Sequence, residues 1–333
     1  MSPHPAGSML GLGVLDPDLE AQLVAGMASV EVALRDAVRS DYPFVTEASR
    51  HLVDAGGKRF RPLLVLLAAQ FGDPQAPGVV PSAVVVELTH LATLYHDDVM
   101  DEAALRRGAA SANARWDNTV AILTGDFLFA KASDILADLG PDAVRIQAQT
   151  FERLCTGQIR ETVGPQDGAD PVAHHLRVLA DKTGSLIATS GRFGAMMSGA
   201  DPRIVETMTA FGERIGVAFQ LADDIVDIAS ETTDSGKTPG TDLREGVPTL
   251  AGLMALSMDD DPRLGDLLTR PLDDDADHAE ALARLRPHPA LVAARDEARA
   301  WADGARELLA DLPEGSPRDA LSTLCDYVVT RTG

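Results

Sequence analysis

The sequence predicts an all-α protein in which long helices surround a buried core. Apolar residues recur at steps of three and four, as at Leu19, Leu23, Met27, Val30 and Leu34, which is the spacing of one face of a helix. Strand signals are scarce, because aromatic residues make up only 4% of the chain and no stretch alternates apolar and polar residues between hairpin turns. With 45% hydrophobic residues among 333, the chain can bury its apolar faces in one large helical bundle.

Clusters of Gly, Pro and Asp divide the chain into its expected elements. We expect the acidic segment 258–278 to be a solvated connection, and Ser235 to Gly246 to be a loop too long for a plain helix connection. Residues 1–15, with three Gly and two Pro, are expected to be a mobile N-terminus, and 16–333 to be a single domain. The helices predicted from the periodicity are 19–34, 43–55, 61–72, 81–101, 115–139, 142–162, 171–199, 203–229, 247–257, 290–311 and 317–331.

The charge balance excludes several classes of partner. Fifty-one acidic residues against 29 basic ones give a net charge of −22, which argues against a nucleic-acid partner and against an anionic membrane surface. No apolar run approaches the roughly 20 residues of a membrane span, and the basic region of a targeting peptide is absent before Arg35. Two cysteines, Cys155 and Cys325, cannot make a disulfide scaffold, so we expect a cytoplasmic protein.

A cluster of carboxylates follows the apolar segment Val84 to Tyr95. On a helix, Asp97 and Asp101 lie one turn apart on one face, and Asp98 lies beside them. Carboxylates this close repel one another unless cations compensate. Hard oxygen ligands suit Mg²⁺ held jointly with substrate phosphates. A solvated acidic helix end explains this motif equally well when the motif is taken by itself.

The same spacing returns at Asp223, Asp224 and Asp227, again at the end of an apolar helix. Two such clusters facing each other across a bundle core could hold several Mg²⁺ ions around one polyphosphate. We prefer this interpretation to solvated helix ends, because chance seldom repeats a whole pattern at the end of a second buried helix.

Basic residues accompany the first cluster. The segment Gly56 to Pro62 is a Gly-rich turn with three cations that opens an apolar helix, and its N–H groups and charge favour an anion; an ordinary basic helix start is the alternative. Arg106 and Arg107 suit bidentate phosphate binding, or simple ion pairing with the aspartates. His90 lies two helical turns before Asp97 and so on the same face, although a lone buried His is usually a core residue.

Taken together, these motifs resemble those of the trans-type polyprenyl diphosphate synthases, the polyprenyl synthetase family. The likeness covers roughly residues 45–255 and is specific, because every motif occurs in the family's order. The matching segments are Gly56–Pro62, His96–Asp101, Leu105–Gly108, Lys182–Thr183, Phe219–Asp227 and Gly240–Gly246, with a weaker likeness at Tyr327–Val329.

The resemblance implies a fold of the isoprenoid synthase type around a central cavity, usually as a homodimer. It implies head-to-tail condensation of isopentenyl diphosphate with an allylic diphosphate such as farnesyl or geranylgeranyl diphosphate. In such enzymes metal ions promote ionisation of the allylic C–O bond, the isopentenyl double bond attacks the cation, and a proton is lost. The implied cofactor is Mg²⁺, several ions per site, with Mn²⁺ as a substitute.

The resemblance also assigns roles to residues. One departure is Val247, where many relatives have a lysine after the Arg-Glu-Gly segment, and Arg244 is the candidate to replace that cation. The implied metal ligands are Asp97, Asp98, Asp101, Asp223, Asp224 and Asp227, and all but the last, together with Lys182, are the implied catalytic residues. The implied contacts are Arg106, Lys182, Thr183, Gln220 and Lys237 for the allylic diphosphate, and Lys58, Arg61, His90 and Arg107 for isopentenyl diphosphate.

Product length and rival functions complete the prediction. Thr93 and Ala92, respectively four and five positions before the first aspartate, are small, which favours an open tunnel and a long all-trans product that is passed to a membrane. The alternatives are a short-chain synthase, a class I terpene cyclase, a non-catalytic synthase partner and a purely structural bundle. A cyclase leaves Lys58, Arg61 and Arg107 unexplained, and a non-catalytic partner would be expected to have lost an aspartate cluster.

Overall fold

The computed structural model describes residues 15–230, 239–258 and 261–330. Across these ranges the chain is all-α apart from one pair of two-residue strands, which confirms the predicted fold class. None of the described helices combines the length and the apolarity that crossing a bilayer requires. Lys237 and the predicted mobile N-terminus lie outside the described residues, except for Leu15, which is buried.

The chain forms two compact units, and neither is a continuous segment. Unit 1 comprises residues 1–151, 186–212 and 309–323, and unit 2 comprises residues 152–185, 213–308 and 324–333. The single domain expected over 16–333 stays a prediction.

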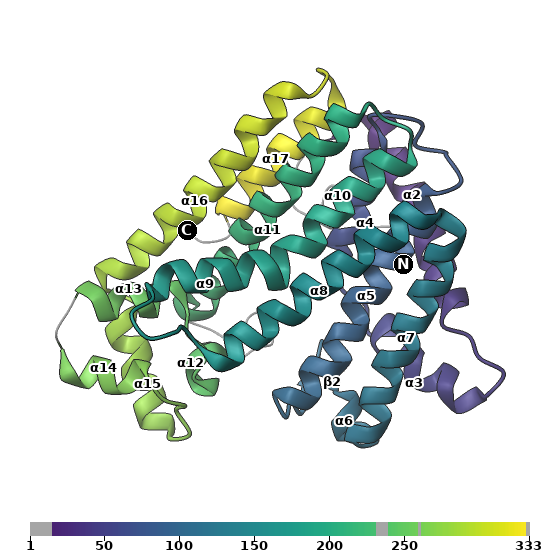
Figure 1. Ribbon diagram of the computed structural model, residues 1–333. Coiled ribbons are helices and arrows are strands. Elements are labelled where there is room, and N and C mark those ends of the chain that lie inside the picture. Colours follow the sequence, from purple (N-terminus) through teal and green to yellow (C-terminus); the bar gives the residue numbers. More distant parts are fainter. Residues whose placement is uncertain (1–14, 231–238, 259–260, 331–333) are drawn as a thin grey trace. The chain divides into compact units, whose positions relative to one another are not determined.

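Unit 1 contains the early helices and the strand pair, whereas the later helices belong mainly to unit 2 (Figure 1). Four helices, α8, α10, α11 and α17, divide their residues between the units. In order, the elements are α2 (Pro17–Ala37), α3 (Pro43–Asp54), α4 (Phe60–Ala69), α5 (Val79–Met100), β1 (Leu105–Arg106), β2 (Ala109–Ala110), α6 (Ala112–Arg115), α7 (Asn118–Leu139), α8 (Pro141–Val163), α9 (Pro171–Leu179), η1 (Ala180–Gly184), α10 (Ser185–Met197), α11 (Pro202–Ala229), α12 (Thr241–Glu245), α13 (Leu250–Met258), α14 (Pro262–Leu268), α15 (Asp275–Leu285), α16 (Pro289–Leu308), η3 (Leu309–Asp311) and α17 (Ser316–Thr330).

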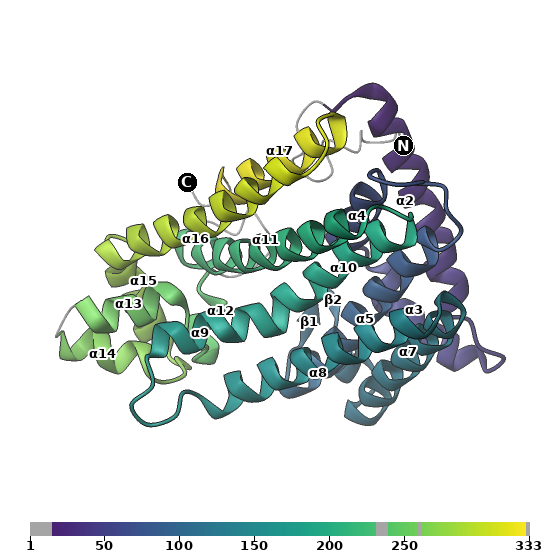
Figure 2. The same cartoon turned by 45° about the horizontal axis from the view of Figure 1, so that its top comes forward.

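Helix α5 is the centre of unit 1 and lies beside α4 and α7 in both ribbon views (Figures 1 and 2). It is buried nearly all round, from Val79 to Tyr95, as the sequence predicts for a central helix. Helix α2 packs on α4 and α5 through its predicted apolar stripe, of which Leu19, Leu23, Val30 and Leu34 are buried. The side chain of Asp16 caps α2 by accepting the N–H groups of residues 18 and 19.

Unit 2 has its own apolar core, in which α13 packs against α16. The segment 258–278 is not the solvated connection that its acidity predicts, because it contains α14 and the start of α15. Asp261 and Asp274 are the N-caps of these helices, and Leu264 and Leu267 reach the core. Capping and ion pairing, rather than hydration alone, therefore account for part of the acidic composition.

Three predicted boundaries also differ. The helix expected over 171–199 contains a π-helical turn, η1, between α9 and α10. The helix expected over 115–139 begins at Asn118, because the Asp117 side chain accepts the N–H of Val120 and caps α7 there. The loop expected at 235–246 contains the short helix α12.

Candidate active site

The first aspartate cluster lies at the C-terminal end of α5. The Asp101 N–H donates to the Asp97 carbonyl over 2.8 Å, so these two residues lie one turn apart, as predicted. Asp98 is fully buried, and its Oδ1 accepts a hydrogen bond from Arg106 Nε at 2.5 Å. Its Oδ2 has no hydrogen-bond partner among the described residues. Burial raises the pKa of Asp98, and the charge of Arg106 acts in the opposite direction.

A tight hairpin after α5 gives the neighbouring residues Arg106 and Arg107 different contacts. The turn between β1 and β2 has positive φ at Arg107 and Gly108, which glycine adopts without strain. Arg106 pairs with Asp98, whereas Arg107 Nη1 donates to the carbonyl oxygens of Leu52, at 3.0 Å, and of Gly56. Ion pairing with an aspartate, one of the two alternatives, is thus observed for Arg106, whereas Arg107 binds backbone carbonyls of the Gly-rich turn. Phosphate binding by either arginine stays a prediction.

The Gly-rich turn needs its glycines because Arg107 lies against it. Gly56 and Gly57 have φ of 83° and 142°, and a Cβ built on Gly57 would lie 2.8 Å from Cζ of Arg107. A side chain at position 57 would therefore displace the guanidinium as well as strain the backbone. The turn positions exposed Lys58 next to the start of α4.

Three of the four residues expected to bind isopentenyl diphosphate, Arg61, His90 and Arg107, lie close enough together to interact electrostatically, and they are called the basic group of unit 1. Arg61 is half-buried, and its Nε has no hydrogen-bond partner among the described residues. Burial lowers the pKa of Arg61 to about 10, with Glu87 opposing and Arg107 adding to the effect. Burial also lowers the pKa of His90 well below its ordinary value, and the charges of Arg61 and Arg107 add to this. Burial and the two guanidinium charges therefore both favour the neutral form of this imidazole.

Arg59 has a structural role that the sequence did not indicate. Its side chain is buried and donates to Glu31 Oε1 at 2.6 Å, to Glu87 Oε1 at 2.7 Å and to the carbonyl of Val53 at 2.8 Å. Arg59 is one of three neighbouring cations, and no local signal distinguishes it from Lys58. Its acidic partners lie 28 residues away in either direction along the chain.

The second aspartate cluster lies near the end of α11, in unit 2. Asp224 is buried, and its Oδ1 accepts a hydrogen bond from Gln220 Nε2 at 2.9 Å. Burial raises the pKa of Asp224 well above its ordinary value, and the negative charge of Asp242 is the next largest cause. The Asp242 N–H donates to Asp227 Oδ2 at 3.2 Å. Asp242 belongs to the Gly-Thr-Asp segment that the sequence matched without assigning it a role.

Lys182 and Thr183, two of the residues expected to contact the allylic diphosphate, lie on η1. Thr183 Oγ1 donates to Gln220 Oε1 at 3.2 Å, so Thr183, Gln220 and Asp224 form one chain of hydrogen bonds. Lys182 Nζ lies 2.5 Å from Glu161 Oε2. Single π-helical turns inside α-helices are frequent at functional sites.

His175 is a further residue near this cluster that sequence reasoning missed. It is buried on α9, and its Nε2 lies 3.9 Å from Asp224 Oδ2, with no hydrogen-bond partner among the described residues. His175 follows His174 in an otherwise largely apolar helix, and nothing in the local sequence distinguishes it from a core residue. Near Val247, the departure from the family pattern, Arg244 donates to the exposed Asp275 at 2.7 Å.

The site residues fall into two groups. Within the described ranges, no three carboxylate, imidazole or thiol groups converge closely enough to form a metal site by themselves. Unit 1 contains Asp97, Asp98, Asp101, Lys58, Arg61, His90, Arg106 and Arg107, and unit 2 contains Asp223, Asp224, Asp227, Lys182, Thr183 and Gln220.

Comparison with known proteins decides the family. The family model described as polyprenyl synthetase matches residues 42–285. The chain belongs to the polyprenyl synthetase family. The chain is 50% identical over 332 residues to a nonaprenyl diphosphate synthase of Mycobacterium tuberculosis, covering 99% of both chains. Members of this family with such names are transferases, and this chain is accordingly assigned to the prenyltransferases.

Solved structures agree with the family assignment. A geranylgeranyl pyrophosphate synthase from Corynebacterium glutamicum, complexed with calcium and isoprenyl diphosphate, has a TM-score of 0.85 and 48% identity, covering 96% of this chain and 98% of that one. A decaprenyl diphosphate synthase from Rhodobacter capsulatus has a TM-score of 0.87 and 34% identity, covering 95% and 99%. These similarities extend over nearly the whole chain.

Proposed function

We propose that this polyprenyl synthetase condenses isopentenyl diphosphate head-to-tail with an allylic diphosphate and releases diphosphate. The main support is the arrangement at the end of α5, where a carboxylate cluster and a partly buried basic group occur in one unit. The carboxylates can bind metal ions that hold one diphosphate, and the basic group can bind a second diphosphate directly. A reaction between two diphosphates requires both kinds of site. A terpene cyclase has no use for the basic group.

The aspartates fit Mg²⁺, which is the cofactor we propose, with Mn²⁺ as a substitute. Asp97 and Asp101 offer hard oxygens one turn apart, and Asp98 has a buried oxygen without a hydrogen-bond donor. We propose that Asp223, Asp224 and Asp227 form the second set of ligands. Bound Mg²⁺ would supply charge that stabilises the departing diphosphate.

The other residues bind and orient the two substrates. Arg61, His90, Arg107 and Lys58 would hold the diphosphate of isopentenyl diphosphate, with Arg61 Nε available as a donor. Arg106, Lys182, Thr183 and Gln220 would contact the allylic diphosphate, as would Lys237, which lies outside the described residues. Because Arg106 already pairs with Asp98, it would also hold that carboxylate in place.

The aspartate assignment is tested by turnover of isopentenyl and farnesyl diphosphates with saturating Mg²⁺. Asp97→Ala and Asp223→Ala are each expected to lose several kcal/mol of transition-state stabilisation, on the order of 10³-fold in rate. Asp36→Ala, which removes an exposed carboxylate of α2, is the matched control and should keep the wild-type rate. Near-normal turnover by Asp97→Ala would contradict the proposed role of the first cluster.

We propose that the product is a long all-trans polyprenyl diphosphate. The named relatives include nonaprenyl, decaprenyl and geranylgeranyl synthases, whose products differ in length. The argument for a long product therefore comes from the residues of α5. Ala92 is fully buried, Thr93 is half-buried, and Leu88 and Val85 beyond them are apolar and buried. We expect about seven to ten isoprene units, because each methylene kept in apolar surroundings gains about 0.8 kcal/mol.

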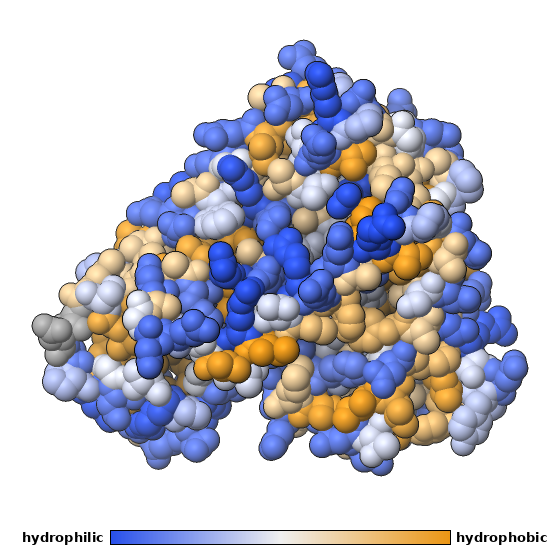
Figure 3. Space-filling view, in the orientation of Figure 1, coloured by the Kyte–Doolittle hydropathy of each residue, from blue (hydrophilic) through white to orange (hydrophobic). Residues whose placement is uncertain are grey.

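We propose a homodimer in the cytoplasm that passes its long product to a membrane. Figure 3 shows apolar surface over the lower part of α7, where Ile122 and Leu123 are exposed. An exposed apolar patch of this kind is typical of a protein interface. Sedimentation equilibrium of the purified protein tests the dimer, and a monomer at micromolar concentration would contradict it.

A further inference from the structure

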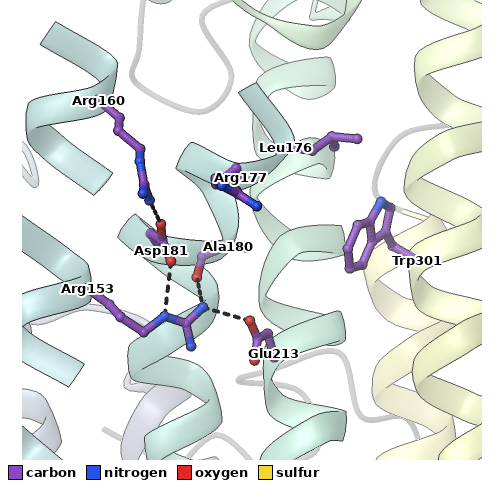
Figure 4. Close-up of a pocket in the computed structure, with 8 residues that line it drawn as sticks. All are labelled: Arg153, Arg160, Leu176, Arg177, Ala180, Asp181, Glu213 and Trp301. Carbon is purple, nitrogen blue, oxygen red and sulfur yellow. Dashed lines mark hydrogen bonds and ion pairs between the residues drawn. The ribbon is translucent and has the colours of Figure 1, made fainter. Parts of the chain in front are cut away.

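A cavity in unit 2 is unusual because arginines line it in a strongly acidic chain. Its volume is about 480 Å³, within the size range of small-molecule sites. Figure 4 shows three arginines on one side and Trp301 on the other. The residues that line the cavity are Arg153, Arg160, Leu176, Arg177, Ala180, Asp181, Glu213 and Trp301, and none of them has a role in the proposed active site.

Asp181 and Glu213 form ion pairs with two of the three arginines, and the third arginine is available to bind an anion. Arg153 contacts Asp181 Oδ1 at 3.0 Å and Glu213 Oε1 at 2.7 Å, and Arg160 contacts Asp181 Oδ2. Arg177 has no ion pair with any described residue and carries no dashed line in Figure 4. The lining therefore has one more positive than negative formal charge.

The rest of the lining is apolar. Leu176 and Trp301 pack against the core of unit 2 and also face the cavity. The indole Nε1 donates to Glu297 at 2.9 Å, which holds the ring in one orientation. A ring face and guanidinium groups in one cavity suit a ligand with a charged end and an apolar or aromatic end.

We propose that this cavity is an effector site for an organic diphosphate. The phosphates would bind Arg177 and, in competition with Asp181, the guanidinium groups of Arg153 and Arg160. The organic part would pack between Leu176 and Trp301. Guanidinium groups bind phosphate bidentately, and a diphosphate has enough oxygens for more than one of them. Prenyl and nucleoside diphosphates share this chemistry.

The position of Asp181 connects the cavity to the proposed active site, so the regulatory effect rests on the proposed function. Asp181 belongs to η1, the turn that carries Lys182 and Thr183. Thr183 in turn contacts Gln220, which contacts Asp224. An anion that binds Arg153 and Arg160 would break their ion pairs with Asp181. These ion pairs hold η1 against α8, so η1 would lose contacts that fix its position. We expect it to weaken binding of the allylic substrate.

Binding is measured by calorimetry in chelator, so that no metal-dependent binding of the probe at the aspartate clusters contributes. The probes are inorganic diphosphate, ADP and farnesyl diphosphate. Arg177→Ala removes an exposed guanidinium that makes no ion pair with a described residue, and it should weaken binding of an organic probe by about tenfold or more. Arg145→Ala, an exposed arginine of α8 elsewhere on the chain, is the matched control and should bind like the wild type.

The comparison of probes tests each part of the proposal. Tighter binding of ADP or farnesyl diphosphate than of inorganic diphosphate supports the apolar wall and tells which source of diphosphate the cavity prefers. Equal binding of all three would overturn the organic part. Absence of binding, or equal binding by Arg177→Ala and wild type, would overturn the site.

The regulatory effect is measured with ADP during steady-state turnover. ADP should raise the KM for the allylic substrate by about fivefold or more in the wild type, with little change in kcat. Arg177→Ala should keep the basal rate and lose this response, and an unchanged response would overturn the regulatory step. If the wild-type enzyme turns over its substrates but Arg177→Ala binds the probes as the wild type does, only the effector site is refuted. If Arg177→Ala weakens probe binding but the wild-type enzyme shows no turnover, only the proposed function is refuted.

Discussion

Replacing Glu87 by Gln tests whether a buried ion pair organises the basic group of unit 1. Arg59 and Glu87 are both buried, with side chains 5% and 2% exposed, and Arg59 Nη1 lies 2.7 Å from Glu87 Oε1. The change keeps the shape of the side chain and removes its charge. It also removes the anion that most raises the pKa values of Arg59, Arg61 and Arg107.

The expected cost follows from burial. Removing one partner of a buried ion pair costs about 3–5 kcal/mol, and the amide oxygen of Gln can still accept a hydrogen bond, so we expect a value near the low end. Glu31 also contacts Arg59, at 2.6 Å, but is 27% exposed. Glu31→Gln should therefore cost only about 1 kcal/mol, close to the value of exposed pairs.

The two variants are compared by thermal unfolding at one scan rate. With about 2 °C of Tm per kcal/mol for a large chain, Glu87→Gln should melt about 6 °C below the wild type and Glu31→Gln about 2 °C below it. If both variants melt within about 1 °C of each other, burial is not what gives the pair with Glu87 its strength, and the reasoning fails.

Other predictions concern the substrates and the thiols. Lys58→Ala should raise the KM for isopentenyl diphosphate more than that for the allylic substrate, because it removes binding made equally in ground and transition states; steady-state kinetics would contradict this by an effect confined to the allylic KM. Ala92→Phe should shorten the product to about three or four isoprene units while condensation continues, because it fills apolar space; chromatography of the products shows the lengths, and an unchanged long product would refute the tunnel. Burial raises the pKa of Cys325 to about 12, whereas Cys155 is exposed. A chromogenic disulfide reagent should therefore label Cys155 alone in the native protein at about pH 8, and equally rapid labelling of both thiols would contradict this. The Cys325 thiol ionises at lower pH in the unfolded chain than in the folded protein. The free energy of unfolding should therefore decline as pH rises above about 9, which urea unfolding at several pH values measures.

Local sequence determined the helices and the spacing of the aspartates. Periodicity at three and four residues is a property of neighbouring positions, so the stripe from Leu19 to Leu34 follows from the sequence directly. The burial of α5 nearly all round follows equally from its long apolar run. Helical geometry likewise places Asp97 one turn from Asp101 without reference to the rest of the chain. The family motifs are equally local, which is why the sequence sufficed for the fold class and the family.

Tertiary structure alone decided what each charged residue contacts. Arg59 and Lys58 are neighbours in the sequence, yet Arg59 is buried between Glu31 and Glu87 while Lys58 is exposed. Arg153 and Arg160 share Asp181 across about 20 to 30 residues of chain. The attraction between two charges depends on the distance between them, and the packing of the helices sets that distance. The sequence by itself does not give the distance between residues that are far apart along the chain. The partners of a buried charge are therefore known only when the helices that bring them together have been placed.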